Sequence, residues 1–157
     1  MRVLMTVDED FSNYKTPAML LSAISCSFKC EKDCGIKCCH NSPLLSLEVM
    51  NIEDSVLIDN YMKNPITSAV VIAGLEPFDQ YDEVLSFIQA LRQHTDDDVV
   101  IYTGYTEQEC AEKIEELKQF CNIIVKFGRF IPNQQHHFDE VLGVELASEN
   151  QYGRKIS

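Results

Sequence analysis

Short, continuously apolar segments alternate with segments of helical periodicity along most of this chain, and this alternation constrains the fold more than any other feature. The predicted strands cover residues 18–25, 68–73, 98–102 and 122–126, and the predicted helices cover residues 51–63, 80–93 and 107–120. A strand, a helix and a further strand in succession form a parallel pair through a right-handed crossover. Strands that are apolar on both faces fit a sheet that is covered on both sides. The sequence therefore predicts an α/β fold with a parallel sheet.

Local signals set the expected element boundaries. Asn51 is the expected N-cap of the first helix, since a short polar side chain can accept a hydrogen bond from the free N–H groups there. Thr106 and Glu109 have the spacing of a capping box at the start of the third helix. Beyond the fourth strand we expect a polar loop over 132–138, a fifth short strand within 141–146 and a polar tail over 148–157. No linker interrupts the 157 residues, so we expect a single domain over 1–157.

Turn-like or reactive residues follow each predicted strand. These are Cys26, the GLEP turn at 74–77, the TGY turn at 103–105 and the FGR turn at 127–129. The carboxyl ends of parallel strands meet at one edge of a sheet, and α/β proteins bind their ligands there. The sequence therefore predicts one functional site, built from all four strand ends.

Five cysteines, Cys26, Cys30, Cys34, Cys38 and Cys39, lie within fourteen residues of a segment over 26–46 that we expect to be an irregular loop. Thiolates gathered in this way are ligands for a metal ion or an iron–sulfur cluster. Structural zinc is the main alternative; its second ligand pair would be Cys38 or Cys39 with His40, or with His136 and His137. The two remaining cysteines, Cys110 and Cys121, are expected to be small buried apolar residues.

The net charge limits the kinds of partner that the protein can bind. Lys and Arg number 13 against 25 Asp and Glu, for a net charge of -12, which disfavours binding to nucleic acid or to an anionic membrane surface. No apolar run approaches the ~20 residues that span a bilayer. The start of the chain, MRVLMTVDEDF, lacks the features of a signal peptide. We therefore expect a cytoplasmic protein, with cysteines that serve as ligands or redox groups rather than as disulfides.

These motifs together resemble the radical S-adenosylmethionine (radical SAM) superfamily, and within it the activating proteins of anaerobic ribonucleotide reductases. The resemblance rests on a strand followed by C-x3-C and on five further motifs in order: CHN at 39–41, GLEP at 74–77, YTGY at 102–105, GRF at 128–130 and SENQ at 148–151. It implies a partial (β/α) barrel with a parallel sheet of about four to six strands. The segment 26–41 would then be the cluster loop.

The resemblance also implies a ligand set. In the family, three thiolates of a C-x3-C-x2-C signature hold three irons of a [4Fe-4S] cluster. Here Cys26 and Cys30 fit the signature, whereas eight residues separate Cys30 from Cys39. Cys39 is the expected third ligand because His40 and Asn41 then match the family. Cys34 remains the alternative third ligand, since C-x3-C-x3-C is closer in length.

The family's chemistry implies the rest of the site. S-adenosylmethionine chelates the open fourth iron, and its reductive cleavage releases a 5′-deoxyadenosyl radical. Gly74, Glu76 and Pro77 would approach the methionine amine, with Leu75 in the place of the family's second glycine. Asn41, Thr103 and Gln151 would line the nucleoside pocket. Three roles remain open for Arg129: it could pair with an anionic cofactor group, pair with a partner's carboxylate, or lie on the surface without a specific role.

The resemblance implies two kinds of partner. One is a glycyl-radical enzyme such as an anaerobic ribonucleotide reductase, which the chain would activate. The other is an electron donor such as flavodoxin or ferredoxin. The alternative functions on the same fold are a non-catalytic iron–sulfur or zinc binding module and a cluster-bearing electron carrier.

Overall fold

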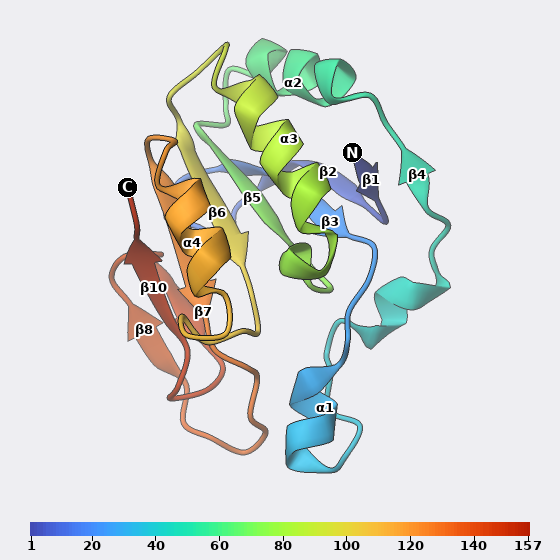
Figure 1. Cartoon of the computed structure of the whole chain (residues 1–157), viewed down its shortest axis with the longest axis vertical. Helices are drawn as coiled ribbons and strands as arrows, with labels where there is room; N and C mark the ends of the chain where they lie inside the picture. Colours follow the sequence, from blue (N-terminus) through green and yellow to red (C-terminus); the bar gives the residue numbers. More distant parts are fainter.

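A six-stranded sheet with the order β10-β7-β6-β5-β3-β2 forms the centre of the computed structural model, which describes residues 1–157 (Figure 1). Its four middle strands are parallel: β3 (Ala18–Ala23), β5 (Ala69–Gly74), β6 (Asp98–Tyr102) and β7 (Ile123–Phe127). The edge strands β2 (Thr6–Asp10) and β10 (Tyr152–Lys155) run antiparallel to their neighbours. This confirms an α/β fold, with a mixed sheet rather than a purely parallel one. The sheet is open, ends at β2 and β10, and is not a closed barrel.

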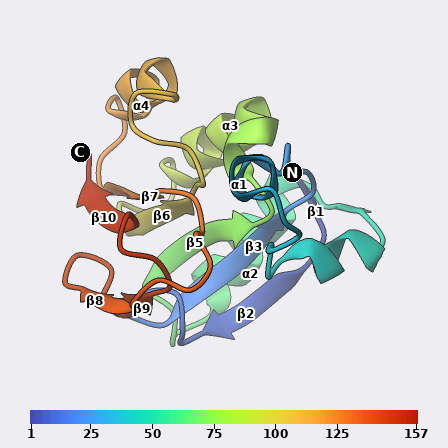
Figure 2. The same cartoon turned by 90° about the horizontal axis from the view of Figure 1, so that it is seen from below.

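Alternation along the parallel strands divides the core into two layers. On one face, strand residues pack with the helices α2 (Asp54–Lys63), α3 (Tyr81–Leu91) and α4 (Ala111–Leu117). On the other face, a smaller cluster forms around Leu20, Val71, Val100 and Ile124, covered by Tyr14, Leu142 and Leu146. Figure 2 shows α3 and α4 on one side of the sheet and the strands β8 (His137–Asp139) and β9 (Val144–Leu146) on the other. Both faces of the middle strands are therefore buried, which explains their continuously apolar sequences.

Two expected helix starts are wrong. Asn51 lies in the short strand β4 (Met50–Asn51), which pairs with β1 (Arg2–Val3), and α2 begins after Glu53. The capping-box bonds of Thr106 and Glu109 do form, with Glu109 Oε2 accepting from the Thr106 N–H at 2.9 Å. However, a turn follows them and α4 runs only from Ala111 to Leu117. For Thr106 and Glu109 the cause is that capping hydrogen bonds form in turns as well as in helices; for Asn51 it is the pairing of β4 with β1.

The carboxyl-terminal segment is more ordered than its polar sequence indicates. The expected loop over 132–138 ends in β8, and the expected fifth strand is β9, which pairs with β8 in a separate two-stranded sheet. The expected polar tail contains β10, which joins the main sheet beside β7. These strands lie at edges or outside the main sheet, so most of their residues stay accessible and carry no apolar alternation.

The cysteine segment is not an irregular loop throughout. It contains the helix α1 (Lys29–Cys34) and the 3-10 helix η1 (Ser42–Ser46). Helix α1 buries none of its residues, so it leaves no apolar periodicity in the sequence. Gly35, with φ of 71°, ends the helix, and its N–H donates to the carbonyl of Glu31. Figure 1 shows α1 at one end of the molecule, beyond the sheet. None of the helices has the length and apolar composition that a membrane crossing requires.

Candidate functional site

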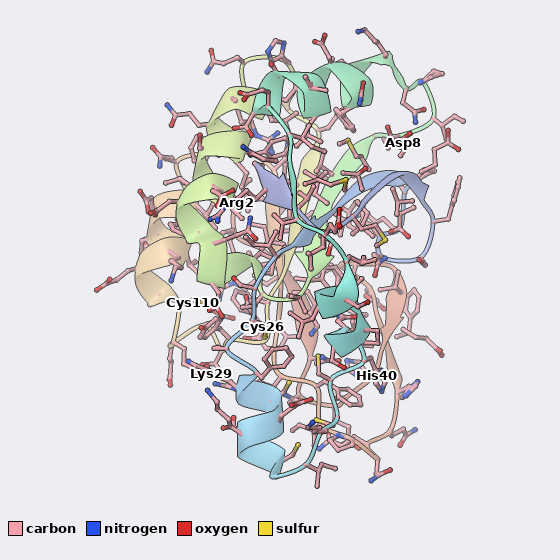
Figure 3. All side chains as sticks on the ribbon, turned by 90° about the vertical axis from the view of Figure 1, so that its right-hand side faces the viewer. Arg2, Asp8, Cys26, Lys29, His40 and Cys110 are labelled. Carbon is pink, nitrogen blue, oxygen red and sulfur yellow. The ribbon has the colours of Figure 1, made fainter.

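A cavity of about 520 Å³ opens at the carboxyl ends of the parallel strands and extends along the sheet face opposite the helices. Its wall includes three thiols of the cysteine segment, Cys26, Cys30 and Cys39. The other sequence-predicted residues in the wall are Asn41, Gly74, Glu76, Thr103 and Gln151. Pro77 is not in the wall; it begins the 3-10 helix η2 (Pro77–Gln80) behind the GLEP turn. Figure 3 shows Cys26, Lys29 and His40 at the end of the molecule where α1 lies.

The five clustered cysteines divide into two groups. Cys26, Cys30 and Cys39 line the cavity, whereas Cys34 and Cys38 do not. The sulfurs of Cys34 and Cys38 instead contact each other at 3.1 Å. Nowhere do three His, Cys, Asp or Glu side chains converge at the spacing that one metal ion needs, and this applies to the zinc sets as well. Cys39 therefore lies with Cys26 and Cys30 in the cavity wall, and Cys34 lies outside this group.

Hydrogen bonds from backbone N–H groups hold the segments that carry two of the cavity thiols, Cys26 and Cys39. The chain leaving β3 is held by η2, because Gln80 Oε1 accepts from the Ile24 N–H at 2.7 Å and Asp79 Oδ2 accepts from the Ser27 N–H at 2.6 Å. Cys26 Sγ accepts from the Phe28 N–H at 3.2 Å, and the Cys39 N–H donates to Glu31 Oε1 of α1 at 3.2 Å.

Burial makes two of these thiols, Cys26 and Cys30, poor acids in the free protein. Desolvation raises the pKa of Cys26 to about 11 and also raises the pKa of Cys30. Iron binds thiolates, so the positive charge of the irons must offset this desolvation when a cluster assembles. Cys26 and Cys30 are therefore not activated nucleophiles in the free protein.

The GLEP turn requires glycine at its first position. Gly74 has φ of 88°, and a Cβ there would lie 2.3 Å from Ser22 Oγ. The carbonyl oxygen of Gly74 accepts a hydrogen bond from Asn41 Nδ2 at 2.6 Å. This bond joins the segment after Cys39 to the end of β5, so the CHN and GLEP motifs form a single wall.

Glu76 ties the ends of β5 and β6 together. One carboxyl oxygen accepts from the Thr103 hydroxyl at 2.8 Å and from the Phe78 N–H at 3.1 Å, and the other accepts from the Gly104 N–H at 2.8 Å. Desolvation raises the pKa of Glu76 in spite of these donors. Because the Thr103 hydroxyl donates to Glu76, Thr103 contributes to the wall mainly by holding the turn in place.

Lys126 is a wall residue that sequence reasoning missed. It lies in β7, is 7% exposed and forms no ion pair with a carboxylate; its Nζ donates to the carbonyl of Gly128 at 2.9 Å. Burial lowers the pKa of Lys126 to about 8. Gln151 Nε2 donates to the same carbonyl at 3.3 Å. The available signal was a lysine within the otherwise apolar strand sequence NIIVK.

Ion pairs and a cation–π contact hold α1 against the carboxyl ends of the strands. Arg129 Nη1 and Nη2 lie 2.9 and 2.5 Å from the carboxylate oxygens of Glu109, and its Nε lies 2.8 Å from Asp33 Oδ2 in α1. Lys29 Nζ lies 4.1 Å from the ring centroid of Tyr105. Arg129 lines the cavity, but its charge is paired with carboxylates of this chain. The Arg129 guanidinium is therefore held in place by internal ion pairs.

The two isolated cysteines differ from each other. Cys110 is buried in the helix-side core, as expected. Cys121 is exposed, and its thiol donates to Asp96 Oδ1 at 3.1 Å, so the expectation of burial is wrong for it. The cause is its place just before Asn122, which has a left-handed φ of 55° in the turn that leads into β7.

Comparison with known proteins finds one family whose profile matches this chain. The profile of the 4Fe-4S single cluster domain family matches residues 18–151, which run from the start of β3 through the cysteine segment to Gln151. Neither the curated proteins nor the solved structures include a match to this chain. The matched span contains the three cavity thiols and the whole wall between them, and thiolates are the ligands that iron–sulfur clusters take. The chain therefore belongs to the 4Fe-4S single cluster domain family.

Proposed function

We propose that the chain holds a [4Fe-4S] cluster through Cys26, Cys30 and Cys39 and uses it to cleave S-adenosylmethionine reductively. The observation that carries this proposal is the division of the five cysteines, with only three of them in the cavity wall. Three thiolates hold three irons and leave the fourth for another ligand. When bound, the reduced cluster supplies the electron that breaks the sulfonium C–S bond and yields the 5′-deoxyadenosyl radical.

The cavity has room for a small molecule beside the thiols. Its volume of about 520 Å³ falls within the range of pockets that hold drug-sized ligands. S-adenosylmethionine carries an amine, a carboxylate and a sulfonium group. Lys126 gives the wall a buried positive charge for an anionic group, and the Glu76 carboxyl group lies among the residues that face the same space.

The protein's own residues would bind and orient this ligand. Gly74 has no side chain that would clash with Ser22, and its carbonyl oxygen holds the Asn41 amide at the wall. Gln151 and Lys126 share the carbonyl of Gly128, which keeps their amide and ammonium groups side by side. We also propose that the open sheet corresponds to the partial barrel that the resemblance implies.

The target of the radical is proposed on the resemblance alone. We propose a glycyl-radical enzyme such as an anaerobic ribonucleotide reductase, with flavodoxin or ferredoxin as the electron donor. A purified reductase of this class, incubated with the reduced protein and S-adenosylmethionine, would then acquire a glycyl-radical EPR signal. If it acquires none while 5′-deoxyadenosine is released, the target is a different molecule.

Leu75 favours a second candidate function. It is 8% exposed and lines the cavity at the position where the resembled family has glycine. Its side chain occupies space close to the wall, and a displacement of ~1 Å at a reacting centre costs about a hundredfold in rate. An electron carrier or a non-catalytic cluster module would tolerate this side chain without penalty.

The decisive experiment is anaerobic turnover of the reconstituted, reduced protein with S-adenosylmethionine. We expect equal amounts of 5′-deoxyadenosine and methionine, which would be absent without reductant. Cys39→Ala should lose most of its iron, its cluster absorbance and its turnover, whereas Cys34→Ala should keep all three. A cluster that is reduced and reoxidised without releasing either product would instead establish the carrier or module function. Loss in Cys34→Ala but not in Cys39→Ala would favour the shorter ligand spacing.

A further inference from the structure

Cys34 and Cys38 form a thiol pair outside the cavity. Cys34 is the last residue of α1, and Gly35 reverses the chain with φ of 71°. Residues 36 and 37 then bring Cys38 back, so that the two sulfurs lie 3.1 Å apart. Both side chains are partly exposed, and neither sulfur lines the cavity that Cys26, Cys30 and Cys39 share.

The two sulfurs are close enough to bond after a small movement. A disulfide needs an S–S distance of about 2.0 Å, so the sulfurs must approach by about 1 Å. The turn between them can absorb that movement, because no atom lies within 4 Å of the position where Gly35 would carry a Cβ. Helix α1 buries no side chain, so no core packing opposes the shift.

We propose that Cys34 and Cys38 are a thiol–disulfide exchange site that reacts with small-molecule disulfides such as oxidised glutathione. One thiolate attacks a sulfur of the small disulfide, which breaks that S–S bond and releases one molecule of the small thiol. The second cysteine then attacks the mixed disulfide, forms the Cys34–Cys38 bond and releases the second small thiol. The two cysteines lose two electrons and two protons, and the small disulfide gains them.

This assignment gives the two surplus cysteines a role separate from the cluster. Oxidation ties the end of α1 to the segment before Cys39 and removes two competing thiols from the neighbourhood of the three ligands. The inference rests on the contact between the sulfurs and not on cleavage of S-adenosylmethionine. A protein that fails to turn over can therefore still form this disulfide, and the two failures are distinguishable.

Peptide mapping tests the pairing directly, because trypsin separates the cysteines. Cleavage after Lys29, Lys32, Lys37 and Lys63 places Cys34 alone in 33–37, Cys30 in 30–32, and Cys38 with Cys39 in 38–63. The cluster-free chain is treated with oxidised glutathione, blocked with N-ethylmaleimide and digested. We expect 33–37 linked to 38–63, with Cys26 and Cys30 alkylated. The exposed Cys121 is the internal control and should stop at a mixed disulfide with glutathione.

Variants decide which cysteine of the second peptide is bonded. Cys38→Ser should reduce the linked species at least about tenfold, whereas Cys39→Ser and the matched control Cys121→Ser should retain it. A linkage that survives Cys38→Ser, or a link from 33–37 to 30–32, would overturn the proposal. As a second readout, the Cys34→Ser/Cys38→Ser double variant should still take up about four irons per chain. Failure to load would assign the pair to the cluster and also overturn the proposal.

Discussion

At the scale of single residues, the buried position of the Lys126 side chain has the clearest cost in folding stability. Its ammonium group is buried at the cavity wall with one carbonyl acceptor and no carboxylate partner. Burial of an unpaired charge destabilises the folded state, which is the same effect that lowers the pKa of Lys126 to about 8. Such a cost is retained at ligand sites, where an anionic group supplies the missing partner.

Lys126 therefore predicts an unusual pH dependence. Below about pH 8 the folded and unfolded chains both hold the proton, and the full cost is present. Between about pH 8 and the ordinary value of 10.5, only the unfolded chain holds the proton, so the stability of the folded state rises with pH. Relative to Lys126→Met, the wild-type chain should recover up to about 3 kcal/mol across this window, measured by urea unfolding of the cluster-free protein.

An exposed lysine supplies the control for this measurement. Lys63 has a side chain that is 76% exposed, so Lys63→Met should follow the wild-type curve at every pH. Comparing variants also removes the titration of the thiols and tyrosines, which all three proteins share. Parallel curves for wild type and Lys126→Met would mean that water or a carboxylate solvates the ammonium group.

At the scale of elements, helix α1 depends on what binds beside it. It has six residues, buries none of them and is joined to the sheet by partly exposed pairs such as Arg129 with Asp33. Such pairs contribute at most about 1 kcal/mol each, and isolated helices of this length are unstable in water. Cluster ligation at Cys26, Cys30 and Cys39 would supply the free energy that orders the segment.

Hydrogen exchange measures this coupling. Amide exchange across residues 27–42 should slow at least about tenfold when the cluster assembles, because local opening must then break iron–thiolate bonds. Helix α3 is the internal reference, since Val84, Phe87, Ile88 and Leu91 anchor it in the core of both forms. Equal exchange across 27–42 with and without the cluster would mean that the segment is preorganised.

At the scale of the whole molecule, burial decides what the sequence could predict. The four parallel strands were predictable because residues such as Val71 and Val100 are buried between two layers and leave continuous apolar runs. The edge strands β2 and β10 and the helix α1 were not, because contacts made elsewhere in the chain determine their structure and their own residues stay largely exposed. Antiparallel pairing of β10 with β7 depends on where the preceding chain places Tyr152 in space, and no local sequence pattern encodes that position.

The candidate site follows the same division. Topology alone places the four strand ends at one edge, so Cys26, Gly74, Thr103 and their neighbours were predictable as a group. Side-chain geometry was not predictable: the contact of Cys34 with Cys38 and the bidentate pairing of Arg129 with Glu109 require coordinates. The buried position of Lys126 was missed because a lysine at a strand end is usually solvent-exposed.

Under the proposed function, Cys26, Cys30 and Cys39 would hold a cluster whose fourth iron is left for S-adenosylmethionine. The most direct measurement is the EPR spectrum of the reduced, cluster-loaded protein with and without S-adenosylmethionine. Adding S-adenosylmethionine should shift the signal of the reduced cluster, because its amine and carboxylate would ligate the fourth iron. Methionine at the same concentration controls for the amino-acid group alone. A signal that S-adenosylmethionine leaves unchanged, in protein with about four irons per chain, would contradict the claim.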